Sequence, residues 1–473
     1  MSNNRRTLLQ SLGYGSASLG DSISYSFIGS YLLVFLTTVL HMKPALAGII
    51  TAAGCVWNAL INPVIGWFCD RARSRSGRRR ILILLASFPL AGSTLLLFVR
   101  LPLGGLGAFF WYAFLTMAFW TAYTCFLVPY LALGAAYTPD YDGRTRLRLA
   151  ASQFNTVGSM LALAFPPSIR KLFLRLGASP AGSWSLTALV IAVLGFASLL
   201  VTFLSARRFD QTDRNAGLLG FDRSEGRFSL PSLLREYFSI GSLRPVRSLL
   251  AASLCLLTGY EMYMADLVYL FTYDLGFSAG RSTFFLALRG IYGTGLLAVT
   301  AFAVRKLDKR NTLIAAYLAS AAGMTLIRLT GLNSFPAQLL YMLMVALATC
   351  VYWQLIPSMY YDVADYDRLK TGKNRQAAVI SFQGFLESAA LGLGSLLLGL
   401  VLQLAGFQGA LSEQAPATVL WIRNLATVVP LVFTGLGILA LWTYPIDRAA
   451  HQRILLDLKN RDAGEQHPAD RQL

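Results

Sequence analysis

The chain has 473 residues, of which 55% are hydrophobic and 14% charged, and its net charge is +18. Soluble domains carry about 25% charged residues, so this composition argues against a soluble enzyme or binding module. The basic residues lie in short gaps between apolar runs rather than on one face, which argues against a nucleic-acid partner. Five cysteines and three histidines are scattered without ligand spacing, so we expect no metal and no cofactor.

Long apolar runs follow one another along the whole chain. A helix needs about 20 apolar residues to cross the hydrocarbon core of a bilayer. Lipid cannot satisfy free backbone N–H and C=O groups, and the runs do not alternate as barrel strands would. We therefore predict an all-α membrane protein with twelve transmembrane helices, over residues 9–40, 45–68, 80–101, 106–134, 148–169, 184–206, 247–273, 281–304, 312–331, 335–362, 376–405 and 417–445.

The segments between these runs differ in charge. Roughly four-fifths of the 41 Lys and Arg residues fall in alternate segments, starting with the N-terminal one, which places both termini in the cytoplasm. We expect a monomeric, multi-pass protein of the plasma (inner) membrane. The boundaries predict a six-helix half, a cytoplasmic loop in which Ser229-Leu-Pro starts a short interfacial helix, a second half and a cytoplasmic tail, over 1–206, 207–246, 247–446 and 447–473.

The two halves repeat one pattern of charged residues. A basic segment with an aspartate follows the second and the eighth helix, and an Asp-Tyr-Asp motif follows the fourth and the tenth. The positive-inside bias explains the basic residues but not the aspartates, so we infer a duplicated unit, which is typical of transporters. We expect ion pairs that gate the inner face, from Asp70, Arg78, Asp308, Asp362 and Asp365.

Polar groups also occur within the predicted helices. Ionisable groups at membrane depth cost about 2.5–3.5 kcal/mol each on insertion scales, so they are candidates for function. We expect groups from both halves to converge on a central cavity and hold a polar solute. The candidate contacts are Asp21, Tyr25, Tyr123, Gln153, Arg289, Trp353 and Gln383.

Simpler roles stay open for several of these side chains. Arg289 either pairs with Glu261 or Asp266, or meets an anionic group of the substrate. Asn58 and Asn62 also suit hydrogen bonds between helices. Asp266 also suits a solvated position near the outer surface, and Trp353 also suits ordinary packing.

Several short motifs recur along the chain in a characteristic order and spacing. They are Leu19-Gly20-Asp21, Asn62-Pro63, Arg73-Ser-Arg75-Ser-Gly77-Arg78, Val128-Pro129-Tyr130 and Asp362-Val-Ala-Asp365-Tyr366. With these motifs the chain resembles the glycoside–pentoside–hexuronide:cation symporters of the major facilitator superfamily, most clearly the melibiose and glucuronide permeases. The resemblance covers the whole chain and implies a major facilitator fold of two pseudo-symmetric six-helix halves. It also implies secondary active transport of a glycoside, uronide or related sugar derivative by alternating access.

The resemblance carries over unevenly to individual residues. Asp21 and Trp353 match sugar-pocket residues of melibiose permease, and Tyr123 with Thr124 matches its helix-four pair. Its two cation-ligating aspartates in helix two fall on Asn58 and Asn62. Its other polar sugar-site residues fall on or near Leu127, Leu131, Ser152 and Ser388, which puts galactoside recognition in question.

Neutral asparagine oxygens make a poor cage for a hard cation and cannot carry a proton. We therefore predict a coupling proton rather than sodium, with uncoupled facilitation as the rival. The coupling candidates are Asp21, Asn58, Asn62, Thr124, Glu261 and Glu387.

Other functions stay open on the same fold. A lysolipid or other amphiphile is the second cargo, because some vertebrate relatives of the family resemble lysolipid transporters and because Leu127 and Leu131 replace polar groups. A non-transporting membrane sensor or assembly factor is the third hypothesis. A membrane enzyme comes last, because no catalytic constellation is visible in the sequence.

Overall fold

The computed structural model describes residues 2–72, 78–136, 141–205, 230–372 and 375–466, and every regular element in these ranges is a helix. The elements are α1 (Ser2–Thr38), α2 (Pro44–Ala72), α3 (Arg78–Leu96), α4 (Gly105–Ala136), α5 (Tyr141–Ala164), α6 (Pro166–Arg175), α7 (Pro180–Ser205), α8 (Leu230–Gly241), α9 (Arg244–Tyr269), the π-helix η2 (Leu270–Asp274), α10 (Ala279–Thr330), α11 (Phe335–Thr371), α12 (Gln376–Leu404), α13 (Pro416–Trp442) and α14 (Arg448–Gln466).

Within the described ranges, nine helices are long and apolar enough to cross a membrane. One of them, α10, consists of two helices that meet at Asp308, whose φ of 67° and ψ of 176° are not helical. The Asp308 carboxylate accepts a hydrogen bond from the Asn311 backbone N–H at 3.0 Å, as an N-cap does. The break lies in the gap predicted between 281–304 and 312–331.

The helix predicted over 148–169 is divided in the structure. α5 ends at Ala164, and the short helix α6 starts at Pro166. Proline is favoured in the first turn of a helix because its missing N–H has no partner there, whereas inside a helix it removes a hydrogen bond. The prolines at 166 and 167 therefore end one helix and begin the next.

The chain divides into two compact units. The first unit comprises Met1–Phe228, Met262–Gly290 and Gly392–Ala426, and the second comprises Ser229–Glu261, Ile291–Leu391 and Thr427–Leu473.

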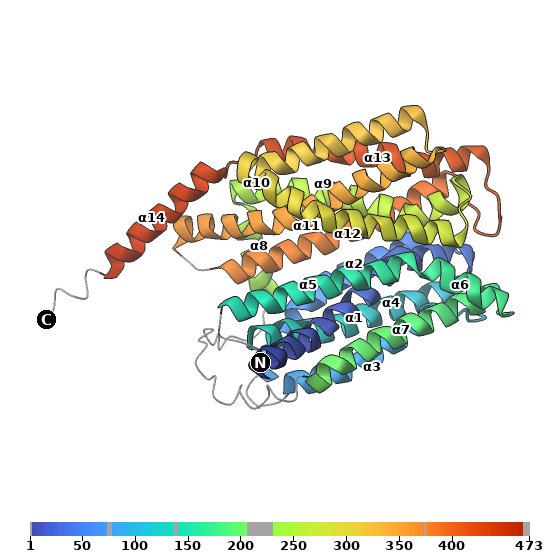
Figure 1. The fold of residues 1–473 in the computed structure, drawn as a ribbon, viewed down its shortest axis with the longest axis horizontal. Helices are drawn as coiled ribbons and strands as arrows, with labels where there is room; N and C mark the ends of the chain where they lie inside the picture. Colours follow the sequence, from blue (N-terminus) through green and yellow to red (C-terminus); the bar gives the residue numbers. More distant parts are fainter. Residues whose placement is uncertain (1, 73–77, 137–140, 206–229, 373–374, 467–473) are drawn as a thin grey trace. The chain divides into compact units, whose positions relative to one another are not determined.

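In the first unit, α1 packs along α5 and α7 (Figure 1). Small polar residues join α1 to α7: the Ser16 hydroxyl lies 2.8 Å from that of Thr202, and the Ser198 hydroxyl donates to the Ser16 carbonyl oxygen at 2.6 Å. Such residues let membrane helices approach closely. A Cβ atom at Gly158 of α5 would lie 2.7 Å from the Leu19 carbonyl oxygen. This close packing fixes the position of the next turn of α1, which carries Asp21.

In the second unit, α11 has defined ends. Ser334 caps its N-terminus by accepting the Ala337 N–H, and Gly372 ends it with a left-handed φ of 74°. The helix α14 packs along α11. The helix α8 lies in the predicted cytoplasmic loop, where Tyr237 packs against Phe382 of α12 with ring centroids 5.3 Å apart.

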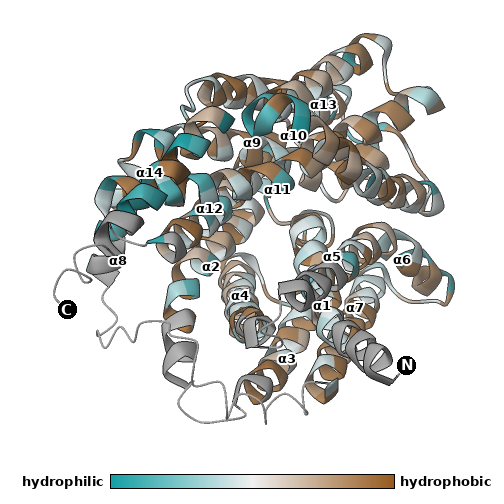
Figure 2. Ribbon diagram, turned by 60° about the vertical axis from the view of Figure 1, so that its left-hand side comes forward, coloured by the Kyte–Doolittle hydropathy of each residue, from teal (hydrophilic) through white to brown (hydrophobic). Residues whose placement is uncertain are grey.

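Large apolar side chains lie on the surface of the long helices. Leu85 and Phe88 of α3 are 60% and 59% exposed, and α3 is largely hydrophobic in Figure 2. In contrast, α14 is mostly hydrophilic in the same view. Exposed apolar surface of this extent indicates contact with lipid rather than with water.

Candidate substrate and coupling site

A half-buried carboxylate, that of Asp21, and three aromatic rings meet between α1 and α4. The Asp21 carboxylate forms a hydrogen bond with the Tyr123 hydroxyl. The Tyr25 ring lies 5.6 Å from that of Trp120 and 5.9 Å from that of Tyr123, between ring centroids. The Oδ1 atom of Asp21 is buried without a hydrogen-bond partner. The structure thus brings together the predicted residues Asp21, Tyr25 and Tyr123, which we call the Asp21 cluster together with Trp120.

Trp120 is a member of the Asp21 cluster that was not predicted. It lies three residues before Tyr123 on α4, and residues at this spacing share one face of a helix. Its ring contacts that of Tyr123 at 5.4 Å, nearly edge-on. The spacing from Tyr123 was the available signal, but one helix alone does not show which of its aromatic residues faces α1.

A neutral hydrogen-bond network joins α2 to α4. The Oδ1 atom of Asn58 accepts from the Thr124 hydroxyl at 3.0 Å and from Nδ2 of Asn62 at 3.4 Å. Asn58 and Thr124 are both buried. Asn58 therefore takes part in interhelical hydrogen bonding, which was one of the two roles expected for the asparagines, and its side-chain oxygen is already engaged. Asn62 bonds to Asn58 within α2.

The second unit holds another carboxylate with a polar partner. Gln383 donates from Nε2 to Oε1 of Glu387 at 2.8 Å on α12. Tyr352 and Tyr360 of α11 lie close enough to Glu387 to interact with it electrostatically. Trp353 is 41% exposed and contacts Tyr352 edge-on.

Two other predicted substrate contacts of the first unit, Gln153 and Arg289, are not part of the Asp21 cluster. Gln153 of α5 is exposed. Arg289 of α10 donates from one terminal nitrogen to the Met264 sulfur at 3.1 Å. Its Nε atom is buried without a partner.

Two roles considered for Asp266, a solvated position and an ion pair with Arg289, are both wrong. Its side chain is completely buried rather than solvated. Neither of its carboxylate oxygens has a hydrogen-bond partner among the described residues, so it does not pair with Arg289. Its short distance from the end of the predicted helix suggested a solvated position, whereas its side chain is fully covered in the structure.

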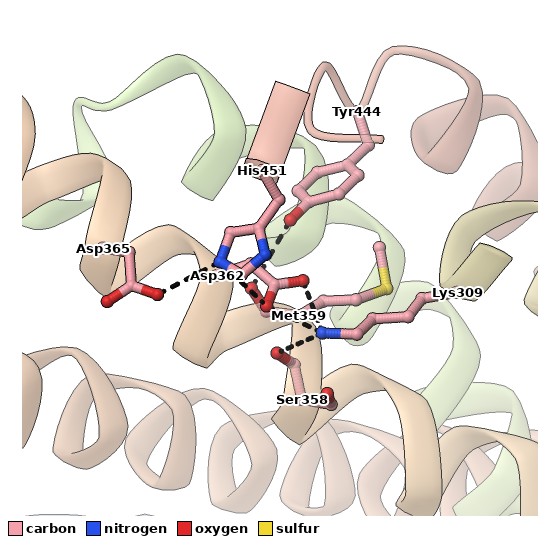
Figure 3. Close-up of polar contacts among 7 residues, drawn as sticks. All are labelled: Lys309, Ser358, Met359, Asp362, Asp365, Tyr444 and His451. Carbon is pink, nitrogen blue, oxygen red and sulfur yellow. Dashed lines mark hydrogen bonds and ion pairs between the residues drawn. The ribbon is translucent and has the colours of Figure 1, made fainter. Parts of the chain in front are cut away.

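Ion pairs connect α10, α11 and α14 at the end of the second unit (Figure 3). Lys309 contacts both oxygens of Asp362, at 2.6 and 2.7 Å. His451 of α14 places Nε2 3.1 Å from Asp365 and 3.6 Å from Asp362. The hydroxyl of Tyr444 donates to the Met359 carbonyl oxygen at 3.4 Å. We call Lys309, Asp362, Asp365 and His451 the Lys309 cluster.

The five predicted gating residues have different positions. Asp362 and Asp365 belong to the Lys309 cluster, and Asp308 caps the second part of α10. The side chains of Asp70 and Arg78 lie outside the described residues. A second ion pair, between Arg375 and Asp367 at 2.6 Å, was not predicted. The hydrogen bond to Asp367 raises the pKa of the Arg375 guanidinium.

We expect Lys309→Gln and Asp362→Asn each to slow transport several-fold, because each leaves one half of a partly buried pair without its partner. Breaking a buried pair costs about 3–5 kcal/mol, and the partial exposure of Lys309 reduces that cost. The double variant should be less impaired than the sum of the single effects. Uptake rates and melting temperatures are measured for the unsubstituted protein, the two single variants and the double variant. Lys370→Gln, which removes an exposed lysine, is the matched control. Strictly additive effects would show that the pair is not a functional unit.

Helices of the first unit approach closely where α1 ends and α2 begins. The Thr37 hydroxyl lies 2.7 Å from that of Tyr269. Gly48 of α2 faces Gly399 of α12: a Cβ atom on Gly399 would clash with the Pro44 carbonyl oxygen and lie 3.0 Å from the Gly48 Cα atom. The Ala45 N–H donates to Gln403 of α12 at 3.2 Å. We call this region the Thr37 end.

Apolar helices that bury carboxylates next to aromatic rings are characteristic of a multi-pass membrane transporter. The comparisons with known proteins agree. The family described as MFS/sugar transport protein matches residues 13–448. The chain therefore belongs to this family, which corresponds to the glycoside–pentoside–hexuronide symporter type expected from the sequence. It is a transporter rather than an enzyme.

Individual relatives match over nearly the whole chain. An uncharacterised symporter of Synechocystis is 28% identical, over 95% of this chain and 96% of the relative. A glucuronide carrier protein homologue of Escherichia coli is 23% identical, over 96% of each chain. The crystal structure of a nucleoside transporter, NupG, has a similar fold, with a TM-score of 0.65 at 13% identity over 92% of this chain and 98% of that one.

Proposed function

We propose that the protein carries a glycoside, a uronide or a related sugar derivative across the plasma membrane, together with a proton. Its relatives include proteins named as symporters and as sugar or uronide carriers, which makes an amphiphilic cargo the weaker alternative. Alternating access would occur between a half over 1–206 and a half over 247–446, linked by 207–246 and followed by the tail from 447. The protein would act as a monomer with both termini in the cytoplasm.

Twelve spans are supported by the helices of the two halves. The two parts of α10 count separately because of the break at Asp308. The spans would be α1, α2, α3, α4, α5 and α7 in the first half, and α9, both parts of α10, α11, α12 and α13 in the second. The bias of Lys and Arg then makes the Thr37 end the outer face.

The observation that carries the proposed substrate class is the Asp21 cluster. A carboxylate accepts hydrogen bonds from sugar hydroxyls, and such charge-assisted bonds are strong. Aromatic rings supply the apolar surface that lines most ligand sites. Asp21 offers one oxygen without a partner, next to Tyr25, Trp120 and Tyr123. The other proposed contacts are Gln153, Arg289, Trp353 and Gln383.

The proposed coupling ion is a proton. Sodium prefers several oxygen ligands with negative charge among them, but the Asn58 oxygen already accepts two hydrogen bonds. Asp21, Glu261 and Glu387 are the carboxylates that we propose as proton carriers. Thr124 and Asn62 would then keep a structural role.

The proposal also covers the residues that gate the inner face. We propose that the Lys309 cluster is the gate of the second half. Asp70 and Arg78 occupy the equivalent slot of the first half in the sequence.

The test is uptake by proteoliposomes of labelled glycosides, glucuronides and lysolipids, each with a pH gradient, a sodium gradient or no gradient. Uptake of a sugar driven by the pH gradient is the expected result. Uptake driven only by sodium would contradict the proposed coupling. Uptake of lysolipid but not of any sugar would replace the proposed substrate class with amphiphiles. Absence of uptake for every tested solute would contradict the proposal that the protein transports them.

A further inference from the structure

The carboxyl group of Asp266 is buried in the first unit and has no assigned role in the proposed transport cycle. None of its surface is exposed, and both of its oxygens lack hydrogen-bond partners among the described residues. An ionised carboxylate in such surroundings would lose its hydration without compensation, and a group in that position binds a proton instead. Burial of this kind therefore favours the neutral, protonated form of Asp266 in this conformation.

The charged surroundings of Asp266 favour the same state. Asp274 and Tyr269 are the titratable groups that act on it among the described residues. Asp274 adds negative charge, but this charge is balanced by Arg423 of α13, whose Nε lies 2.9 Å from Oδ2 of Asp274. The guanidinium of Arg289 contacts the Met264 sulfur instead of Asp266. No cation in the described surroundings therefore compensates an ionised Asp266.

The burial of Asp266 belongs to the closed contact at the Thr37 end. Tyr269 follows Asp266 by three residues on α9, so the two side chains share a face. The Tyr269 hydroxyl contacts Thr37 of α1 at 2.7 Å. The next residues form the π-helix η2, and such irregular turns are frequent at functional sites. Separation of α1 from α9 would remove the hydrogen bond at Tyr269 and admit water towards Asp266.

We propose that Asp266 is a proton-binding site that links protonation to closure of the Thr37 end. When this end is open, water reaches the carboxyl group and it ionises. Closure removes that water, so the end closes only after Asp266 has taken up one proton from the solution on that side. This inference rests on the proposed alternating access, and it adds a site to the proposed proton carriers.

The sign of the pH effect follows from this linkage. The closed form holds one more proton than the open form, so low pH favours the closed form and high pH the open form. Above the pH at which the open form ionises, the ratio of open to closed molecules should rise about tenfold per pH unit, which is the slope for one proton. A neutral amide at this position removes the dependence.

The experiment measures the distance between spin labels on both sides of the Thr37 end. Lys43→Cys in the loop after α1 and Ala410→Cys in the loop after α12 place labels at exposed positions of the first unit. The native cysteines are replaced by serine, and distances are recorded without substrate between about pH 5 and pH 9. Asp266→Asn is compared with the unsubstituted protein and with Asp457→Asn, which removes an exposed carboxylate of α14.

We expect the unsubstituted protein and Asp457→Asn to shift to a longer distance as the pH rises, and Asp266→Asn to keep the short distance throughout. A pH-independent distance in the unsubstituted protein, or an unchanged pH response in Asp266→Asn, would overturn the inference. A shift caused by sodium instead of protons at constant pH would also overturn it. If Asp266→Asn does not fold, Asp266→Leu serves as the second neutral variant. The measurement needs no transported solute, so its failure is separate from failure of the uptake panel.

Discussion

Replacing Asp21 with asparagine should reduce sugar uptake by roughly 10- to 150-fold. A hydrogen bond to a charged group contributes about 1.5–3 kcal/mol, and the amide removes the charge while keeping the size of the side chain. The Tyr123 hydroxyl still finds an oxygen to donate to, so the Asp21 cluster should stay packed. The loss should therefore appear in substrate affinity and not in protein yield or melting temperature.

The same variant can separate the two roles proposed for Asp21. Exchange of labelled for unlabelled sugar at equal concentrations needs binding but no net movement of protons. If Asp21 contacts the substrate, exchange and gradient-driven uptake should fall together. If it only carries the proton, exchange should survive and gradient-driven uptake should be lost. Asp457→Asn is the matched control, and uptake at the unsubstituted level in Asp21→Asn would remove Asp21 from the site.

Replacing Gly399 with valine should reduce transport at least about tenfold while the protein still folds. A Cβ atom at this position would clash with the Pro44 carbonyl oxygen and lie 3.0 Å from the Gly48 Cα atom. Both are backbone atoms, which cannot turn away as a flexible side chain does, and overpacking of this kind costs about 1–3 kcal/mol or more. The helices α2 and α12 should therefore no longer reach the closed contact at the Thr37 end.

The matched control for Gly399→Val is Gly384→Val in the same helix. No atom outside its own neighbourhood lies within 4 Å of a Cβ atom built on Gly384. Uptake measures the effect on transport, and the spin labels at Lys43 and Ala410 measure the opening. A variant that transports normally with the short distance unchanged would show that α2 and α12 need not come this close.

The helices could be predicted from the sequence with good accuracy, because crossing a bilayer demands a long apolar run whatever its partners. The break at Asp308 was predictable for the same reason, since a charged segment interrupts one such run. The early end of α5 was missed because Phe165 and the following prolines are apolar too. Hydropathy does not distinguish an apolar turn from an apolar helix.

The candidate site was less predictable, because its geometry depends on which faces of two helices meet. The contact of Asp21 with Tyr123 joins residues that are far apart in the sequence, and the resemblance to a family, not the spacing, brought them together. Trp120 was missed, and a solvated position was considered for Asp266 although its side chain is buried. The meeting of Asp21 with Trp353 stays a prediction.

The glycine contact between α2 and α12 also has a bioenergetic consequence. Where Gly48 and Gly399 face one another, no side chain separates the two backbones. A chain of hydrogen-bonded water molecules, along which protons hop, needs more room than such a contact leaves. While this end is shut, the seam between these two helices is therefore an electrical insulator, and a resting carrier does not drain the ion gradient across its membrane along that seam.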